Sequence, residues 1–168
     1  MQSSRFPLAL LALTLLFASC KKDSDTTTLR IRLTDGPGDF QQVNVDIREI
    51  TVKTANDTAQ WISIPTNAGI YNLLDFQNGI DTLIAVGPVP LDVLKEVRFI
   101  LGPNNSVMVD SVLYPLTTPS AQESGLKVKI DKPLVVDINT IVLDFDAAQS
   151  IKIEGNSGFK LHPVIRLK

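Results

Sequence analysis

The chain has 168 residues, with 16 basic and 18 acidic side chains for a net charge of -2, and it contains one cysteine and one histidine. A single cysteine excludes an intrachain disulfide. No basic patch or arginine-rich run is apparent in the sequence, so we expect no nucleic-acid partner. A hydrophobic fraction of 44% is ample for the core of one domain.

Residues 1–19 have the pattern of a secretory leader. Arg5 supplies the positive head, residues 8–17 form an apolar run, and the small residues Ala18 and Ser19 precede Cys20. A run of this length is too short to cross a bilayer, which takes about 20 helical residues. We therefore expect the leader to be removed.

The residues around Cys20 resemble the end of a bacterial lipoprotein signal peptide, although Phe17 stands where leucine is usual. The resemblance implies cleavage before Cys20 and lipidation of its sulfur, with acyl chains such as palmitate. Each buried methylene stabilises membrane attachment by about 0.8 kcal/mol. The alternative is an ordinary secreted protein with a free thiol.

Residues 21–28 are polar and predict a flexible tether. Their Lys/Asp/Ser composition resembles the signals of Bacteroidetes surface lipoproteins, which implies a location on the outer membrane, facing the cell exterior. The alternative is a tether that contains no targeting signal. The predicted organisation is a leader at 1–19, a lipidated cysteine with its tether at 20–28, and one domain at 29–168.

Apolar and polar residues alternate with a period of two through much of 29–168. The clearest runs are 29–34, 43–48 and 126–130, and further strands are predicted at 60–64, 97–101, 107–109, 112–116, 134–138, 140–145 and 159–167. Turn-forming residues separate these runs at 35–38, 78–79, 102–105 and 155–158. Many short strands of this kind predict an all-β fold, an antiparallel β-sandwich or barrel.

Two local features qualify this pattern. The apolar positions change phase between Ile47 and Ile50, which predicts a β-bulge at Arg48 and Glu49. Residues 91–96 predict a short helix, with Asp92 as a candidate N-cap.

Several short motifs along the domain, taken in order, resemble one family. They are Leu33-Thr34-Asp35-Gly36-Pro37, Trp61, Leu73-Leu74-Asp75, Val97-Arg98-Phe99, Tyr114-Pro115-Leu116-Thr117, Ser124-Gly125-Leu126-Lys127, Leu143-Asp144-Phe145-Asp146-Ala147 and Leu161-His162-Pro163-Val164-Ile165-Arg166. This series resembles the bacterial lipoprotein domain catalogued as domain of unknown function 4382. The resemblance implies an extracellular β-sandwich of transthyretin-like or immunoglobulin-like type, and no established activity.

The sequence offers no recognisable catalytic set. His162 is the single imidazole, and alternation places it on a solvated strand face with Lys160 and Arg166. Cys20 is assigned to lipid, so a thiol nucleophile is missing. We therefore predict no catalytic residues and no cofactor.

Two pairs of aspartates are the weak candidates for a metal site. Asp144 and Asp146 project from one face of a strand, and Asp35 and Asp39 flank a turn. Calcium takes six to eight oxygen ligands, and neither pair has the spacing of a defined calcium loop. We favour structural roles for them, as strand-edge charges and turn aspartates that bond their own backbone.

The weak candidates for ligand binding are the aromatic residues Trp61, Tyr71 and Tyr114, because a glycan platform uses exposed rings. Trp61 shares a strand face with Ser63, and burial in the core or over a sheet edge is the favoured alternative for its ring.

The preferred function is a lipid-anchored cell-envelope surface module without catalytic activity, which binds a protein or glycan or has a structural role. One alternative is a carboxylate-dependent extracellular polysaccharide hydrolase, in which two acids face each other across a cleft. Another is a fimbrial or adhesin-type subunit completed by a strand of another chain. The membrane, through the lipid anchor, is the expected partner, and the pattern leaves the oligomeric state open.

Overall fold

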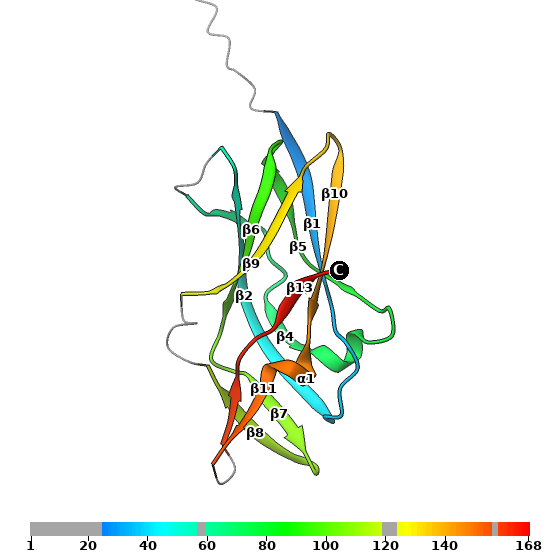
Figure 1. Ribbon diagram of the computed structural model, residues 1–168, viewed down its shortest axis with the longest axis vertical. Helices are drawn as coiled ribbons and strands as arrows, with labels where there is room; N and C mark the ends of the chain where they lie inside the picture. The colour runs from blue at the N-terminus through cyan, green and yellow to red at the C-terminus, as the bar shows by residue number, and fades with distance from the viewer. Residues whose placement is uncertain (1–24, 57–59, 119–123, 156–157) are drawn as a thin grey trace, which may run out of the picture.

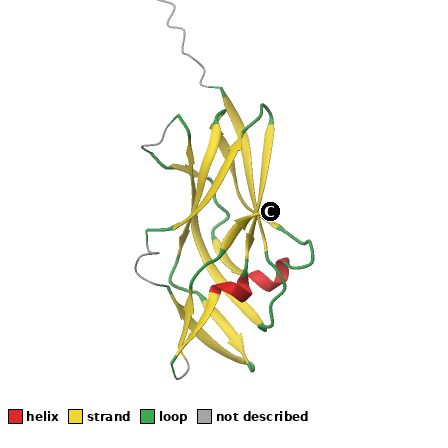
Figure 2. Cartoon of the chain, viewed as in Figure 1, coloured by secondary structure: helices red, strands yellow, loops and turns green. Residues whose placement is uncertain are grey.

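The protein forms two packed β-sheets in an elongated, strand-rich body (Figures 1 and 2). The computed structural model describes residues 25–56, 60–118, 124–155 and 158–168. Residues 1–19, Cys20 and residues 21–24 lie outside the described residues, so the expectations for the leader and anchor stay predictions.

The elements are β1 (Thr26–Thr34), β2 (Gln42–Thr54), β3 (Ile62–Ile64), β4 (Gly69–Asn72), η1 (Leu73–Phe76), β5 (Thr82–Pro90), β6 (Val93–Leu101), β7 (Ser106–Val109), β8 (Val112–Thr117), β9 (Leu126–Pro133), β10 (Ile138–Phe145), α1 (Ala147–Ser150), β11 (Ile151–Glu154), β12 (Gly158–Leu161) and β13 (Ile165–Leu167).

The smaller sheet has the strand order β13-β10-β1-β5, and the larger has the order β11-β12-β8-β7-β2-β6-β9, with β3 and β4 also paired to β2. The predicted all-β sandwich is confirmed. Most neighbouring strands are antiparallel, as expected, but β1 pairs in parallel with β10, and β12 pairs in parallel with β8. Alternation cannot reveal this difference, because it reports which face of a strand is buried and not the direction of its neighbour.

The core lies between the two sheets and is built from the inward residues of alternating strands. Leu29, Ile31 and Leu33 of β1 are completely buried, as their alternation predicts. β1 begins at Thr26, so three residues that the sequence analysis gave to the tether belong to the sheet. None of the helices in the described ranges has the length and apolar character that crossing a bilayer requires.

The predicted bulge in β2 is confirmed. β2 is a single strand of 13 residues, and its pairing with β6 shifts between Ile47 and Glu49. The extra residue returns Ile50 and Val52 to the core side, where both are completely buried. The later half of β2 therefore presents Thr51 and Lys53 on the outer face of the larger sheet.

The helix predicted at 91–96 is wrong, because Val93 opens β6 and pairs with Pro133 of β9. Asp92 lies in the bend between β5 and β6, where its carboxylate accepts a hydrogen bond from the Asn56 backbone amide at 2.6 Å. That hydrogen bond lowers the pKa of Asp92. The carboxylate thus ties the crossing from the smaller sheet to the larger one to the residues after β2, and it does not start a helix.

Two other predicted strands differ from the structure. Residues 134–137 form a loop, and β10 begins only at Ile138. The run 159–167 is divided into β12, in the larger sheet, and β13, in the smaller one. His162 and Pro163 lie between them, and the His162 amide donates to the Ser150 carbonyl at 2.8 Å. Because Pro163 has no amide hydrogen, it cannot donate to the hydrogen bonds between strands. This suits the point at which the chain leaves the larger sheet for the smaller one.

Candidate functional site

The outer face of β2, β6 and β9 gathers basic side chains in two rows. The cross-strand register aligns Thr51 with Arg98 and Lys127, and it aligns Lys53 with Glu96 and Lys129. Residues two apart on a strand project from the same face, about 7 Å from each other. The sequence analysis expected no basic patch, and this expectation is wrong, because the register joins residues that are distant in the sequence.

The indole of Trp61 is surrounded by three of these cations. The Arg98 guanidinium carbon lies 4.3 Å from the centre of the ring, and the Lys53 and Lys127 ammonium nitrogens lie at 5.7 and 5.8 Å. A cation within about 6 Å of an aromatic face is attracted by the negative charge density of the ring. Trp61 therefore holds together three positive charges that would otherwise repel one another. We call Trp61, Lys53, Arg98, Lys127 and Lys129 the Trp61 patch.

Within the described ranges, Lys53, Arg98 and Lys127 form no ion pair with a carboxylate, while Lys129 lies near Asp131 and its charge helps to lower the pKa of that carboxyl. The ion pairs there are formed by Arg32, Arg48, Lys95, Lys160 and Arg166. Arg98 instead donates from Nε to the Thr51 hydroxyl at 3.0 Å. This hydrogen bond orients the guanidinium over the ring but does not neutralise it, so the patch keeps its positive charge.

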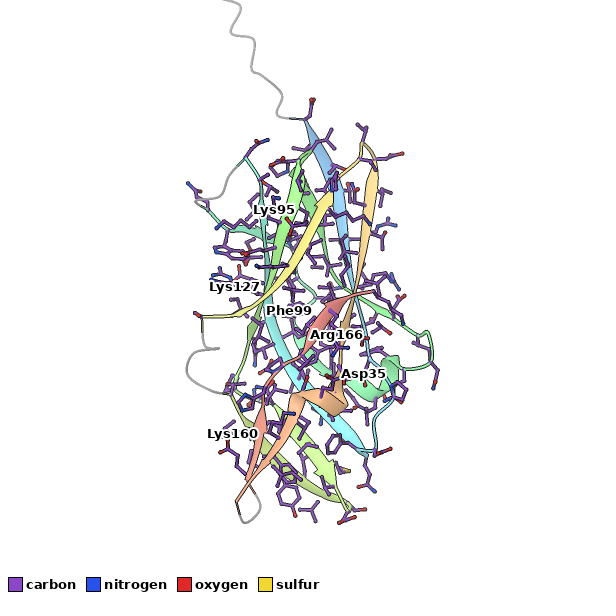
Figure 3. The ribbon with its side chains drawn as sticks, in the orientation of Figure 1. Asp35, Lys95, Phe99, Lys127, Lys160 and Arg166 are labelled. Atoms are coloured by element: carbon purple, nitrogen blue, oxygen red, sulfur yellow. The ribbon has the colours of Figure 1, made fainter. Side chains whose placement is uncertain are left out.

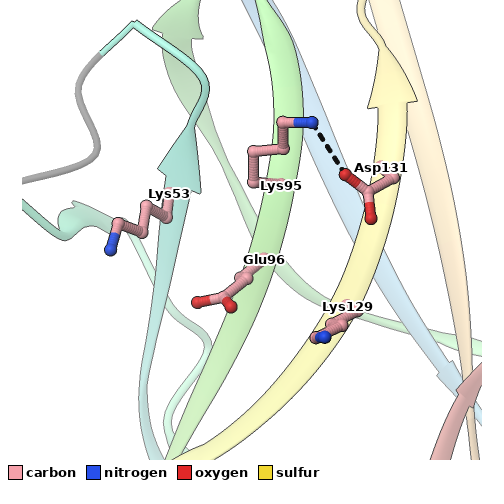
Figure 4. A pocket seen from close by; sticks show the side chains of 5 residues that line it. All are labelled: Lys53, Lys95, Glu96, Lys129 and Asp131. Atoms are coloured by element: carbon pink, nitrogen blue, oxygen red, sulfur yellow. Dashed lines mark hydrogen bonds and ion pairs between the residues drawn. The ribbon is translucent and has the colours of Figure 1, made fainter.

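A depression of about 330 Å³ adjoins the patch and is lined by Lys53, Lys95, Glu96, Lys129 and Asp131 (Figure 4). Lys95 reaches across from β6 to Asp131 of β9, with 2.8 Å between Nζ and Oδ1. The hydrogen bond and charge of Lys95 lower the pKa of the Asp131 carboxyl. Lys53 and Lys129 remain on either side of Glu96, so a carboxylate acceptor lies between two cations.

Asp35 is buried in a structural position. Its side chain accepts hydrogen bonds from the Ala147 amide at 2.8 Å and from Gln77 at 3.3 Å, and the residue is 3% exposed. Burial raises the pKa of the Asp35 carboxyl, and the neighbouring charge of Asp144 raises it further, while the two hydrogen bonds oppose the shift. Asp35 therefore joins the end of β1 to the start of α1, out of reach of a substrate.

Asp144 and Asp146 lie near Asp35, at the ends of β1 and β10, but they have structural partners of their own. Asp144 pairs in register with Thr34, and Asp146 caps α1 by accepting from the Gln149 amide at 2.9 Å. Asp39 is exposed in the loop before β2. No set of three or more potential metal ligands of the Asp, Glu, His and Cys types occurs among the residues that the structure describes. Figure 3 shows Asp35 on the opposite side of the view from Lys95 and Lys127.

The three candidate aromatic residues do not form one platform. Tyr71 pairs in register with Val45, and Tyr114 pairs with Val107, so both tyrosines lie on the inward face of the larger sheet. Trp61 instead contacts the cations of the outward face. The Tyr71 hydroxyl donates to the Asn67 carbonyl, and burial raises its pKa. The ring of Tyr114 lies 5.0 Å from that of Phe159. Trp61 is thus the candidate whose ring lies against several cations.

Asp46 is a completely buried carboxylate that the sequence analysis did not single out. Oδ2 accepts hydrogen bonds from Arg48 at 2.7 Å and from the Asn104 amide at 3.2 Å, while Oδ1 has no partner. The Asp46 amide donates to the Asn105 side chain at 2.9 Å. These contacts fasten the loop between β6 and β7 over β2, which is a structural role.

The fold and the patch together define an all-β sandwich domain with a cationic outer face on its larger sheet. The chain belongs to the family described as Domain of unknown function (DUF4382), which matches residues 26–163. The match begins at the first residue of β1 and ends before β13. No curated protein and no solved structure matches the chain.

Proposed function

We propose that the protein is a lipid-anchored, non-catalytic module of the outer cell surface, and that the Trp61 patch binds a polysaccharide carrying carboxylate or sulfate groups. The observation that supports this function is the cluster of Arg98, Lys53 and Lys127 around Trp61, in which none of the three cations forms an ion pair with a carboxylate of the described residues. A positively charged sheet face suits an extended anionic ligand that lies across the strands. An aromatic ring beside it adds apolar contact for the face of a sugar.

The acidic residue beside two cations of the patch, Glu96, favours a polysaccharide over a nucleic acid. Glu96 lies between Lys53 and Lys129 in the register. Duplex DNA has one phosphate charge per 1.7 Å or so of its axis, and a charge series this dense would place phosphate against Glu96. An acidic polysaccharide has hydroxyl groups between its charged groups, and a hydroxyl can donate to the Glu96 carboxylate.

Reversing two charges of the patch is expected to weaken polysaccharide binding. The R98E/K127E variant should bind polygalacturonate and heparin at least about tenfold more weakly, since a tenfold change needs only about 1.4 kcal/mol. Affinity should also fall with added salt. Titration calorimetry at several salt concentrations, with neutral dextran as the reference polymer, measures both effects.

The matched control is K152E/K168E, which makes the same change in net charge at exposed positions outside the patch. Equal losses in the two double variants would show that only overall charge matters, and would contradict the proposal. Tighter binding of single-stranded DNA than of either acidic polysaccharide would contradict it as well. Circular dichroism of each variant verifies that the fold is retained.

The lipid anchor is tested separately through Cys20. Replacing the cysteine sulfur with the serine hydroxyl removes the atom that carries the lipid, so C20S should move from the membrane fraction to the soluble fraction of the cells. Detergent phase partitioning and intact mass spectrometry of the extracted protein measure this change. Equal membrane association and equal mass increments in C20S and the parent protein would contradict anchoring at Cys20.

A further inference from the structure

The loop between β9 and β10 and the first residue of β10 expose three aliphatic side chains at one end of the sandwich. Val135 is 61% exposed, Val136 is 75% exposed and Ile138 is 49% exposed. Val136 is the most exposed large apolar side chain among the described residues. We call these three residues the apolar tip. Exposing them to water costs free energy unless something covers them.

The apolar tip has a defined conformation. The buried Asn139 side chain accepts from the Val135 amide at 3.0 Å and donates to the Val135 carbonyl at 2.8 Å. The Thr27 hydroxyl lies 2.9 Å from the Val135 carbonyl and 2.8 Å from the Asp137 carbonyl. These bonds fix the loop backbone, so the valines are held outward rather than folded onto the core.

The same hydrogen bonds place the tip beside the start of the fold. Thr27 is the second residue of β1, and the carbonyl of Asp25 accepts from the Leu91 amide at 2.7 Å. Figure 1 shows the beginning of β1 and the connection from β9 to β10 at the same end of the molecule. Cys20 precedes Asp25 by five residues, which span at most about 18 Å when fully extended.

We propose that the apolar tip docks on the surface of the lipid bilayer, with Val135, Val136 and Ile138 entering its interfacial layer. This inference rests on the proposed anchoring through Cys20, because a lipid on that residue would hold the tip within a short reach of the membrane. Insertion of exposed aliphatic residues at the headgroup boundary is favourable in proportion to the apolar area that is buried.

The charges at this end favour apolar insertion over headgroup attraction. Asp25 and Asp137 are exposed beside the exposed Lys132, so the tip is not cationic. A second copy of the chain is a poor occupant, because three side chains fall far short of the 20–30 residues or so that each partner brings to a stable interface. Docking should therefore occur on uncharged phosphatidylcholine and should depend little on salt.

The test places a fluorescent label at the tip of the full, acylated chain in phosphatidylcholine vesicles. Because acylation blocks Cys20, the chain's single cysteine, V136C introduces one reactive thiol for an NBD label. The matched control is I153C, on β11 at a site that is 71% exposed. Lipids with a nitroxide quencher near the headgroup should quench the label at 136 about threefold more than the label at 153.

The outcomes separate this inference from the proposed function. If the chain floats with the vesicles but both labels are quenched equally, the tip does not dock and the anchor stands. If the chain does not float with the vesicles, both the anchoring and the docking are overturned. A blue shift of the label at 136 that grows with protein concentration in lipid-free detergent would assign the tip to a second copy and overturn the inference.

Discussion

Replacing Phe99 with alanine is expected to lower the free energy of unfolding by about 3–5 kcal/mol. Phe99 lies on β6 of the larger sheet and is completely buried. Its ring meets that of Phe145, on β10 of the smaller sheet, edge to face with 6.4 Å between the centroids. The substitution removes an aromatic contact that joins the two layers, and it leaves a cavity at the middle of the core (Figure 3).

Urea unfolding followed by circular dichroism measures this loss. The control is I153A, which truncates an exposed side chain on β11 and should change stability by less than about 0.5 kcal/mol. Since small domains are stable by about 5–15 kcal/mol, F99A should shift the unfolding midpoint far more than the control does. Similar midpoints for F99A and I153A would show that this contact does not hold the sheets together.

Replacing Gly102 with alanine is the second change with a large expected effect, about 2–4 kcal/mol of destabilisation. A Cβ atom at this position would lie 2.2 Å from Oδ2 of Asp46 and 2.4 Å from Nε of Arg48. Arg48 is half exposed and can move, but Asp46 is fully buried and holds the loop through its hydrogen bonds. The added methyl must therefore displace either the carboxylate or the loop from β2.

Gly36 supplies the matched control for this substitution. A Cβ atom there would meet no atom within 4 Å, and Gly36 is not among the glycines with a positive φ. G36A should therefore leave stability nearly unchanged, while G102A lowers the thermal unfolding midpoint. Equal midpoints in differential scanning calorimetry would show that the Asp46 cluster tolerates the methyl group and that its packing is looser than the distances indicate.

Alternation in the sequence was sufficient to predict most of the strands and the sandwich class. It succeeded for β1, β2 and β9, because each has an apolar face on the core and a more polar face directed away from it. The bulge in β2 was visible for the same reason, since a change of phase can be read within one strand. β5 was missed because Gly87, Pro88 and Pro90 interrupt its pattern, although the strand pairs along β1.

The Trp61 patch could not be predicted, because it depends on which strands are neighbours. Lys127 and Lys129 were visible as outward residues of one strand. Lys53 and Arg98 join them only through the pairing of β2 with β6 and of β6 with β9. Trp61 was correctly assigned to the same face as the exposed Ser63, but the three cations around its ring belong to distant parts of the chain.

The position of β1 has a mechanical consequence. β1 lies inside the smaller sheet, parallel to β10 and antiparallel to β5, and it is the first strand after the proposed anchor. Its ladder hydrogen bonds run across the strand, so a pull on the preceding chain along the strand axis loads them in shear, all at once. Under the proposed anchoring at Cys20, drag on a bound polymer would load these hydrogen bonds together, so β1 should resist rupture more strongly than a strand whose bonds break one at a time from one end.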